Sequence, residues 1–343
     1  MAGLVWCAAM TEITSIDRRL AVAPMMDWTD RHARYFLRQI SRHTLLYTEM
    51  ITAAAILRGD REHLLGFDPA EHGLALQLGG ADAQQLAAAA AIGAAWGYDE
   101  INLNVGCPSQ RVQSARFGAC LMAEPETVAR AVEAMRRAVS IPVTVKSRIG
   151  IDGRESYEEF LQFIDCVAAA GCRVFIVHAR IAILTGLTPK DNREIPPLQY
   201  DVVHRLKAER PDLTIILNGG VTSLEMARDA LDRLDGVMIG RTAYQDPYTL
   251  LEADRLIFGA TGPIPSRHDV ARAMIPYIEV ARRRGVPFYS VARHMLGLFN
   301  GLTGSRAFRR FISENGTRPG AGPEVLAQAI SLVSEQGARS EAV

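Results

Sequence analysis

Short stretches that favour β-strands alternate with helical stretches eight times up to about residue 258. The expected strands lie at residues 20–25, 45–50, 74–79, 100–105, 143–148, 174–178, 214–218 and 236–239. Helical patterns lie between them, for example at residues 82–96, 125–139, 157–170 and 223–231. Eight such units with nearly continuous apolar strands predict an α/β fold, a (β/α)8 TIM barrel. A doubly wound sheet is the alternative, but that fold does not call for eight repeats.

The alternation stops after Ile264 and Pro265. The rest of the chain favours helices, at residues 269–284, 289–299, 305–313 and 324–335. We therefore expect a frayed extension at residues 1–17, a barrel domain at 18–260 and a small helical domain at 261–343. Residues 262–318 hold ten Arg or Lys and three Asp or Glu, a net charge of +7. The remainder must carry −7, because the formal net charge is zero. Such a basic segment favours a polyanion partner, and a solvated helical face is the alternative.

The composition narrows the class of protein. No apolar run is long enough to span a bilayer, so we expect no membrane association. The five cysteines are an odd number and no pair has CxxC spacing, which disfavours a zinc site or a redox pair. These features indicate a reducing, cytoplasmic compartment and no bound metal. Nothing in the sequence implies a protein partner, and we expect a monomer.

Polar or flexible residues end every expected strand, where a barrel enzyme places its active site. In chain order they are Pro24, Met25 and Met26, then Glu49, Gln77, Asn102, Asn104, Cys107, Lys146, Arg148, His178, Asn218, Gly219, Gly220, Gly240 and Arg241. Any one of them can be a structural polar group with its hydrogen bonds satisfied. Their recurrence at the same end of every strand predicts an active site there.

Cys107 lies on a polar, basic loop directly after the strand at 100–105. A free cysteine is often only a small core residue, and that alternative stays open. The glycines at 219, 220 and 240 would let backbone N–H groups approach an anion, and Arg241 adds charge. Together they predict a phosphorylated substrate or cofactor. No G-x-G-x-x-G motif opens a helix, so a nicotinamide Rossmann site is not indicated.

Two further segments are candidates for contact with a large substrate. The loop at residues 181–197 is too long for a simple connection, and it carries Lys190 and Arg193. In the basic tail, Arg306 and Arg309 flank Phe308, which could stack on a base or could belong to the core. A solvated surface loop and a solvated helical face are the alternatives.

The motifs APMMDWTD, LALQLGG, NLNVGCPS, VTVKSRIG, VHAR, LNGG and IGR occur in this order between residues 23 and 241. In order and spacing they resemble the tRNA-dihydrouridine synthases, flavin enzymes that reduce uridines in tRNA. The resemblance covers about residues 18–335. The segments LTGLTPKDNREIPPLQY and MLGLFNGLTGSRAFRRF are most similar to the bacterial subfamily that acts on D-loop positions 20 and 20a.

This resemblance implies an FMN site and NADPH as the reductant. The FMN phosphate would lie at Asn218, Gly219, Gly220, Gly240 and Arg241, with His178 nearby. Pro24, Met25 and Met26 would line the isoalloxazine, and Gln77 would bind its polar edge. Lys146 would lie near N1 and C2=O, where a cation stabilises the anionic reduced flavin.

The resemblance also implies how the 5,6 double bond of the uracil is reduced. Flavin N5 would deliver a hydride to C6, and Cys107 would donate a proton to C5. Asn104 would hold the uracil edge, and the uridine must be extruded from the folded tRNA. Lys190, Arg193, Arg306 and Arg309 are the candidate tRNA contacts. An FMN barrel that reduces a free pyrimidine or small enone, a non-catalytic RNA-binding barrel and a flavin-free barrel lyase are the alternatives.

Overall fold

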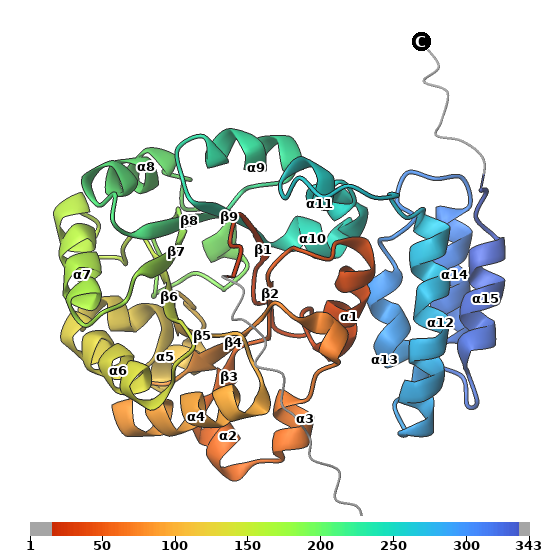
Figure 1. Ribbon diagram of the computed structural model, residues 1–343, viewed down its shortest axis with the longest axis horizontal. Helices are drawn as coiled ribbons and strands as arrows, with labels where there is room; N and C mark the ends of the chain where they lie inside the picture. Colours follow the sequence, from red (N-terminus) through yellow and green to blue (C-terminus); the bar gives the residue numbers. More distant parts are fainter. Residues whose placement is uncertain (1–15, 336–343) are drawn as a thin grey trace, which may run out of the picture.

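The computed structural model describes residues 16–335, and within them nine strands form one parallel sheet. The strands are β1 (Leu20–Val22), β2 (Leu46–Tyr47), β3 (Ile51–Thr52), β4 (Leu74–Gly79), β5 (Glu100–Val105), β6 (Val143–Arg148), β7 (Val174–His178), β8 (Thr214–Asn218) and β9 (Gly236–Ile239). Their order is β1-β9-β8-β7-β6-β5-β4-β2, with β3 also on β4, and a parallel bridge between Ala21 and Leu45 joins the two ends. This closed parallel ring confirms the predicted barrel (Figure 1).

Helices surround the ring on its outside (Figure 1). They are α1 (Arg31–Ile40), α2 (Ala53–Arg58), α3 (Arg61–Leu65), α4 (Ala83–Trp96), α5 (Gln110–Ser114), α6 (Pro125–Ala138), α7 (Tyr157–Ala169), α8 (Tyr200–Glu209), α9 (Leu224–Leu231), α10 (Arg241–Gln245) and α11 (Ala253–Leu256), with 3-10 turns η1 (Pro69–Glu71), η2 (Gly118–Ala123), η3 (Asp191–Arg193) and η4 (Pro247–Leu250). Three of the helices predicted by capping residues begin where expected, because Asp82, Ser156 and Ser223 accept backbone N–H bonds from their first turns.

Two of the expected strands are shorter than predicted. The first ends at Val22 rather than residue 25, and Pro24 follows it without an N–H group to donate to a neighbouring strand. The second, expected at residues 45–50, contains only β2, and β3 begins just after the predicted range. The predicted extension at residues 1–17 lies outside the described residues except for Ile16 and Asp17. The same is true of residues 336–343 in the predicted helical domain.

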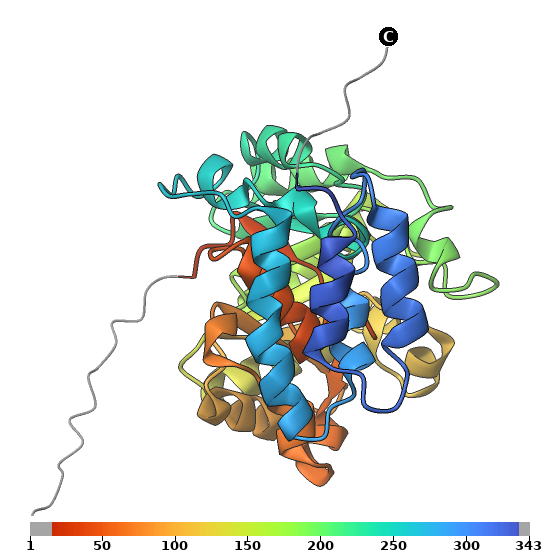
Figure 2. The same cartoon turned by 90° about the vertical axis from the view of Figure 1, so that its right-hand side faces the viewer.

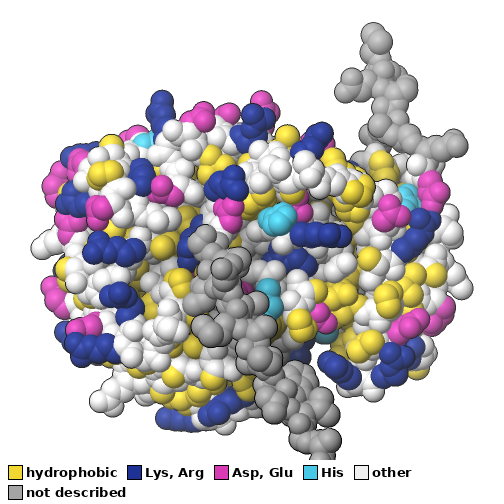
Figure 3. Space-filling model, viewed as in Figure 1, with side chains coloured by type: hydrophobic (Ala, Val, Ile, Leu, Met, Phe, Trp, Pro, Cys, Tyr) yellow, Lys and Arg dark blue, Asp and Glu magenta, His cyan; other side chains and the backbone are white. Residues whose placement is uncertain are grey.

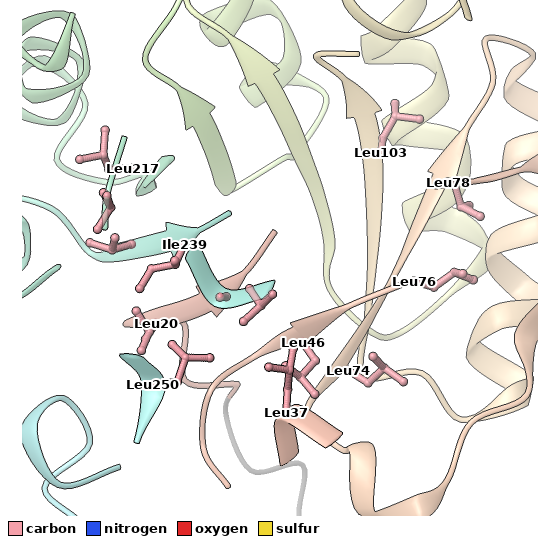
Figure 4. Close-up of a cluster of buried hydrophobic side chains, with 14 of the residues drawn as sticks. Leu20, Leu37, Leu46, Leu74, Leu76, Leu78, Leu103, Leu217, Ile239 and Leu250 are labelled. Atoms are coloured by element: carbon pink, nitrogen blue, oxygen red, sulfur yellow. The ribbon is translucent and has the colours of Figure 1, made fainter. Parts of the chain in front are cut away.

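Strand alternation divides the core into two parts. The outer face of each strand packs under the helices, and Figure 4 shows part of this cluster, including Leu76, Leu103 and Ile239. The opposite face points into the barrel. On one side the interior is apolar, with Ala21, Val174, Ile176, Ile216 and Met238. On the side of β4, β5 and β6 the interior holds buried polar side chains instead, which places polar chemistry inside the barrel.

The C-terminal helices form a bundle beside α1 (Figures 1 and 2). They are α12 (Arg267–Arg283), α13 (Phe288–Ala292), η5 (Arg293–Met295), α14 (Ser305–Asn315) and α15 (Pro323–Ser331). We call residues 267–331 the helical tail. Phe308 is fully buried and its ring lies 4.8 Å from that of Phe299, so Phe308 is a core residue of the tail. The helix expected at 289–299 is shorter, because it ends at Ala292 and tightens into η5. The division into two domains at residue 260 stays a prediction.

One carboxylate joins the tail to the barrel. Asp30 begins α1 as its N-cap, and its Oδ2 accepts hydrogen bonds from Arg293 at 2.7 Å and from the His294 ring at 3.0 Å. Nearby, Trp28 stacks on Tyr244 of α10 with ring centroids 4.5 Å apart, and Tyr244 meets His294 edge-on. The tail is thus held close to the loop that follows β1.

The surface carries charges of both signs. On the face shown in Figure 3, Lys and Arg side chains are interspersed with Asp and Glu on both the barrel and the tail. No helix among residues 16–335 has the length and apolar character needed to cross a membrane.

Candidate active site

Inward-facing side chains at the C-terminal ends of β5 to β8 form one polar cluster. Strand register places Asn104 of β5 beside Lys146 of β6. It also places His178 of β7 beside Arg148 and Asn218. Lys146 Nζ donates a hydrogen bond to Asn218 Oδ1 at 2.8 Å. These predicted residues from four separate strands therefore meet at the barrel mouth.

The cluster brings Lys146, Arg148 and His178 together without a carboxylate among the causes of their pKa shifts. Burial, together with the charge of Arg148, lowers the pKa of Lys146 to about 7, and Cys107 opposes this shift. Burial also lowers the pKa of Arg148 to about 10. Burial and the charges of Arg148 and Lys146 lower the pKa of His178 well below its usual value. The His178 ring has no hydrogen-bond partner in the described part of the chain. An anionic ligand would relieve these shifts, so the electrostatics favour one here.

The loop that carries Cys107 is held from several sides. Asn104 Oδ1 accepts hydrogen bonds from the N–H groups of Gly106 at 3.1 Å and Cys107 at 3.0 Å. Arg148 Nε donates to the Gly106 carbonyl at 3.3 Å, and Ala119 N donates to the Cys107 carbonyl at 2.9 Å. Cys107 itself is half-buried. The thiol therefore lies on a fixed backbone at the edge of the cationic cluster, within reach of a ligand.

Gln77 and Asn102 are buried, and Gln77 joins Asn102 to Asn104 by hydrogen bonds. Gln77 is 1% exposed and Asn102 is fully buried. Asn104 Nδ2 donates to Gln77 Oε1 at 2.8 Å, and Gln77 Nε2 donates to Asn102 Oδ1 at 2.8 Å. Asn102 precedes Asn104 by two residues on the same strand face, and this places it one layer deeper in the barrel than expected. The contact of Gln77 with a flavin stays a prediction.

The glycines of the predicted phosphate site have the conformations that such a site needs. Gly219 and Gly220 adopt left-handed backbone angles, with φ of 110° and 72°. A Cβ on Gly219 would lie 2.6 Å from His178 Cδ2, so a side chain there would displace the histidine. A Cβ on Gly240 would meet nothing within 4 Å among the described residues. The backbone after β9 is thus open at Gly240, whereas His178 packs against Gly219, and Leu198 and Tyr200 pack against Gly220.

Arg241 is joined to the loop at residues 181–197. Its guanidinium lies 2.6 Å from the Glu194 carboxylate and donates to the Arg193 carbonyl at 3.4 Å. Arg180 donates to the carbonyls of Glu194 and Pro196. The predicted phosphate ligand Arg241 therefore also anchors this loop over the β7 to β9 side of the mouth.

Arg148 anchors the same loop from below. Its Nη1 donates to the carbonyls of Ile181 at 3.3 Å and Asn192 at 2.9 Å. The Asn192 side chain is fully buried and exchanges hydrogen bonds with the backbone of Ile183 at 2.7 and 2.8 Å. Lys190 and Arg193 lie on the exposed side of this ordered loop. The charge of Arg193 contributes to the lowered pKa values of Arg148 and His178, so this basic side chain lies near the cluster at the mouth.

The segment after β1 supplies the apolar side of the mouth. Met25 is half-buried, and Met26 is 58% exposed, which is unusual for a large apolar side chain. Asp27 adopts a left-handed backbone with φ of 63°, and its N–H donates to the Glu49 carboxylate after β2. Burial raises the pKa of that carboxyl. This strained turn holds Pro24 and the two methionines where a flat ligand could lie against them.

Arg306 and Arg309 are exposed on α14 of the helical tail. Arg309 donates to Asn300 Oδ1 at 3.0 Å. Neither arginine forms a hydrogen bond or ion pair with the described residues of the mouth. Their proximity to a bound substrate stays a prediction.

Sequence reasoning missed several contacts that organise the site. Arg148 and Asn192 hold the loop at 181–197, and Asp30 pairs with the tail. The alternation Thr144, Lys146, Arg148 could have shown that Arg148 faces the barrel interior, because these positions share one strand face. The pairing of Asp30 has no comparable local signal.

Comparison with known proteins identifies the family to which this chain belongs. The model of the family described as dihydrouridine synthase (Dus) matches residues 21–334. The chain belongs to the dihydrouridine synthase family. A tRNA-dihydrouridine(20/20a) synthase of Shewanella oneidensis is 56% identical over 319 residues, which cover 93% of this chain and 95% of the relative. The enzyme of the same name from Synechocystis sp. is 56% identical over 311 residues, covering 91% and 93%.

Solved structures share the barrel of this dihydrouridine synthase family member at much lower identity. A complex of 2-naphthoyl-CoA reductase with 2-naphthoyl-CoA has a TM-score of 0.52 at 13% identity, and the match covers 70% of this chain and 50% of the reductase. Morphinone reductase has a TM-score of 0.51 at 13% identity, with coverage of 72% and 88%. At this identity the likeness concerns the fold alone.

Proposed function

We propose that this protein is an FMN-dependent tRNA-dihydrouridine synthase that reduces uridines at D-loop positions 20 and 20a with NADPH. The names and the high identity of its relatives support the substrate. The observation that carries the chemistry is the cationic cluster beside the half-buried thiol of Cys107. The cluster suits an anionic cofactor, and the thiol suits a proton donor.

The residues at the mouth fit FMN. Its phosphate would bind at the backbone of Gly219, Gly220 and Gly240, of which Gly240 is open, with His178 and Arg241 beside it. Pro24, Met25 and Met26 would line one side of the ring, and Gln77 would face its polar edge. Lys146 has one hydrogen-bond partner among the described residues, Asn218, so two of its N–H groups are available to the ring. Bound FMN supplies the hydride for C6 of the uracil.

Cys107 would donate the proton to C5 of the uracil as general acid. Its loop is fixed through Asn104 and Arg148, which keeps the donor in place while the base enters. Asn104 would hold the uracil edge with its second Nδ2–H. One hydride and one proton saturate the 5,6 double bond, so the reaction balances.

A uridine inside folded tRNA must leave its stack to reach the barrel mouth. We propose that residues 261–343 act as the tRNA-binding domain of the catalytic barrel at 18–260. Lys190 and Arg193 would contact the D-loop from one side of the mouth, and Arg306 and Arg309 from the tail. The protein would act in the cytoplasm as a monomer.

The direct test uses tRNA from cells that lack dihydrouridine. The purified protein is incubated with NADPH and this tRNA, and the modified positions are mapped. We expect dihydrouridine at positions 20 and 20a. Product elsewhere in the tRNA would retain the chemistry and refute the proposed positions. A yellow protein that NADPH reduces but that makes no product would instead be a small-molecule flavin reductase, and the proposal would be wrong.

A further inference from the structure

A continuous chain of buried polar side chains crosses the barrel interior, from its floor to the Cys107 loop. Its members share the inward faces of the strands, apart from Arg18, which precedes β1. They are Arg18, Tyr47, Glu100, Thr144, Asn102, Gln77 and Asn104. All but Arg18 are at most 9% exposed. A buried polar network of this length is stable only when each member finds a partner, and here each link has one.

At the barrel floor, the network of side chains reaches the Glu100 carboxylate, which can only accept hydrogen bonds. The Glu100 carboxylate is fully buried and lies 2.6 Å from the Arg18 guanidinium, whose positive charge it compensates. Its other oxygen accepts from the Tyr47 hydroxyl at 2.8 Å and from the Thr144 hydroxyl at 2.7 Å. Because the Thr144 proton goes to Glu100, the Thr144 oxygen is left to accept from the other side.

The mouth end is fixed in the opposite sense. Asn104 Oδ1 faces two backbone N–H groups, those of Gly106 and Cys107, which can only donate. The Asn104 amide nitrogen must therefore point to Gln77 and meet an acceptor there.

Between these ends the orientation of every amide is determined. Asn102 Nδ2 donates to Thr144 Oγ1 at 2.9 Å, so Asn102 Oδ1 faces Gln77 and accepts from its nitrogen. Gln77 then turns its oxygen to Asn104. Rotating any one amide by 180° would set donor against donor or oxygen against oxygen. One end of this hydrogen-bond network is at the barrel floor, and the other is at the loop after β5. Both ends require the same donor-to-acceptor direction along the network.

We propose that Thr144 and Asn102 are positioning residues for the reaction. They fix the amides of Gln77 and Asn104, and through Asn104 they fix the backbone that carries Cys107. A consequence is that Asn104 presents an N–H rather than an oxygen to the ligand, which suits a carbonyl of the pyrimidine. The expected effect of these residues on tRNA reduction rests on the proposed function. Their expected effect on the Cys107 loop does not.

Thr144 allows two matched substitutions that separate packing from hydrogen bonding. Thr144→Val keeps the volume and removes the hydroxyl, whereas Thr144→Ser keeps the hydroxyl and loses a methyl group. A packing role predicts that Val is tolerated and Ser is harmful, and a positioning role predicts the reverse. Ser147→Ala is the control, because Ser147 is buried on the same strand and its hydroxyl has no partner among the described residues.

Two readouts follow. In single-turnover assays of the FMN-loaded enzyme, we expect Thr144→Val to slow oxidation of the reduced flavin by tRNA at least ten-fold. Reduction by NADPH should stay within two-fold. In the flavin-free Thr144→Val protein, iodoacetamide should alkylate Cys107 at least three-fold faster than in wild type, with the rate at Cys120 as the internal reference. The reason is that the Cys107 loop is less constrained in this variant. Thr144→Ser and Ser147→Ala should match wild type in both assays.

The outcomes separate the two proposals. If wild type makes no dihydrouridine but Thr144→Val alone changes the Cys107 alkylation rate, the proposed function fails and the positioning role stands. If wild type is active and Thr144→Val matches it in both assays, the positioning role is wrong. If Thr144→Val does not fold, Asn102→Leu breaks the same chain without touching Glu100, and wild-type rates in that variant would overturn the inference.

Discussion

Arg293 Nη2 lies 2.7 Å from Asp30 Oδ2, so a cation of the helical tail pairs with the residue that begins the first helix of the barrel. The same oxygen accepts from the His294 ring, which is fully buried. Asp30 also caps α1 by accepting from the N–H groups of His32 and Ala33. One carboxylate therefore satisfies both the start of a helix and the contact between barrel and tail.

Replacing this carboxylate should weaken the contact in a pH-dependent manner. Burial alone would raise the pKa of Asp30, but the hydrogen bond and charge of His294 hold it below its usual value. A depressed carboxyl pKa adds stability above the unfolded-state value, and this is lost as pH falls below it. At pH 7 we expect Asp30→Asn to lower the free energy of unfolding by roughly 2–3 kcal/mol, and by clearly less near pH 3.

Urea unfolding of wild type and variant at both pH values measures this difference. Asp82→Asn is the matched control, because Asp82 caps α4 and has no ion-pair partner in the described chain. An equal loss at both pH values would contradict the ion-pair account.

Removing the thiol of Cys107 should separate the two halves of the reaction. We expect Cys107→Ala to retain FMN and its reduction by NADPH, because Cys107 lies on the loop beside the cofactor site. Dihydrouridine formation should fall by roughly 10²–10⁴-fold, the usual contribution of a general acid. Rapid-mixing absorbance of the flavin and product analysis of the tRNA measure the two halves. Cys120→Ala, which removes another half-buried thiol in η2, should stay within two-fold of wild type. Product at the wild-type rate from Cys107→Ala would remove the proton donor from the mechanism.

Lys146 should destabilise the flavin-free protein in a defined pH range. Burial lowers its pKa from 10.5 to about 7. Between these values the unfolded chain binds more protons than the folded one, so the Lys146 contribution to stability rises with pH. We expect Lys146→Met to be more stable than wild type at pH 7. The gap should narrow by at most about 1.4 kcal/mol per pH unit up to pH 10. Urea unfolding at pH 7 and 9 measures it, and exposed Lys190→Met should show no such change.

Gly219 is the position where a side chain should harm cofactor binding most directly. Its φ is 110°, and an added Cβ would lie 2.6 Å from His178 Cδ2. We expect Gly219→Ala to weaken FMN binding at least ten-fold, measured by fluorescence titration of the flavin-free protein. Gly153→Ala separates strain from steric conflict, because Gly153 has φ of 81° but its Cβ would meet nothing within 4 Å. Equal losses in both variants would attribute the effect to backbone strain alone.

The tail arginines should act through the phosphates of the tRNA. We expect Arg306→Ala with Arg309→Ala to raise KM for tRNA several-fold with kcat nearly unchanged. The salt dependence of binding should weaken by about one unit of slope for each lost phosphate contact. Filter binding at several salt concentrations tests this. The charge-matched control is Arg130→Ala with Arg137→Ala on α6. An equal effect from the control pair would show only non-specific attraction.

The strands and the mouth residues were within reach of sequence reasoning because both follow local rules. Alternating apolar positions mark the strand faces, and Arg148, His178 and Asn218 occupy the final inward positions of their strands, with Lys146 two residues before Arg148. The depth of Asn102 was missed because the pattern shows which face a residue occupies but not where the barrel mouth begins. Counting two residues back from Asn104 would have placed it correctly.

Contacts between distant segments were beyond such reasoning. No role was predicted for Asp30, and nothing near it in sequence indicates a partner 263 residues away. Arg148 looked like another charge at the mouth, whereas it supports the backbone of Asn192. A side chain's hydrogen-bond partner depends on tertiary packing, and composition and spacing do not encode it.

The pairing of β1 with β9 has a consequence for synthesis of the chain. Leu20 pairs with Val237, so one edge of the first strand has no partner until the ninth has left the ribosome. At translation rates of about 5–20 residues per second, that interval is roughly 10–40 s. During it the nascent chain exposes an unpaired apolar edge, which can associate with other chains. Cellular yield of this protein should therefore depend on chaperones that bind the ribosome-attached chain.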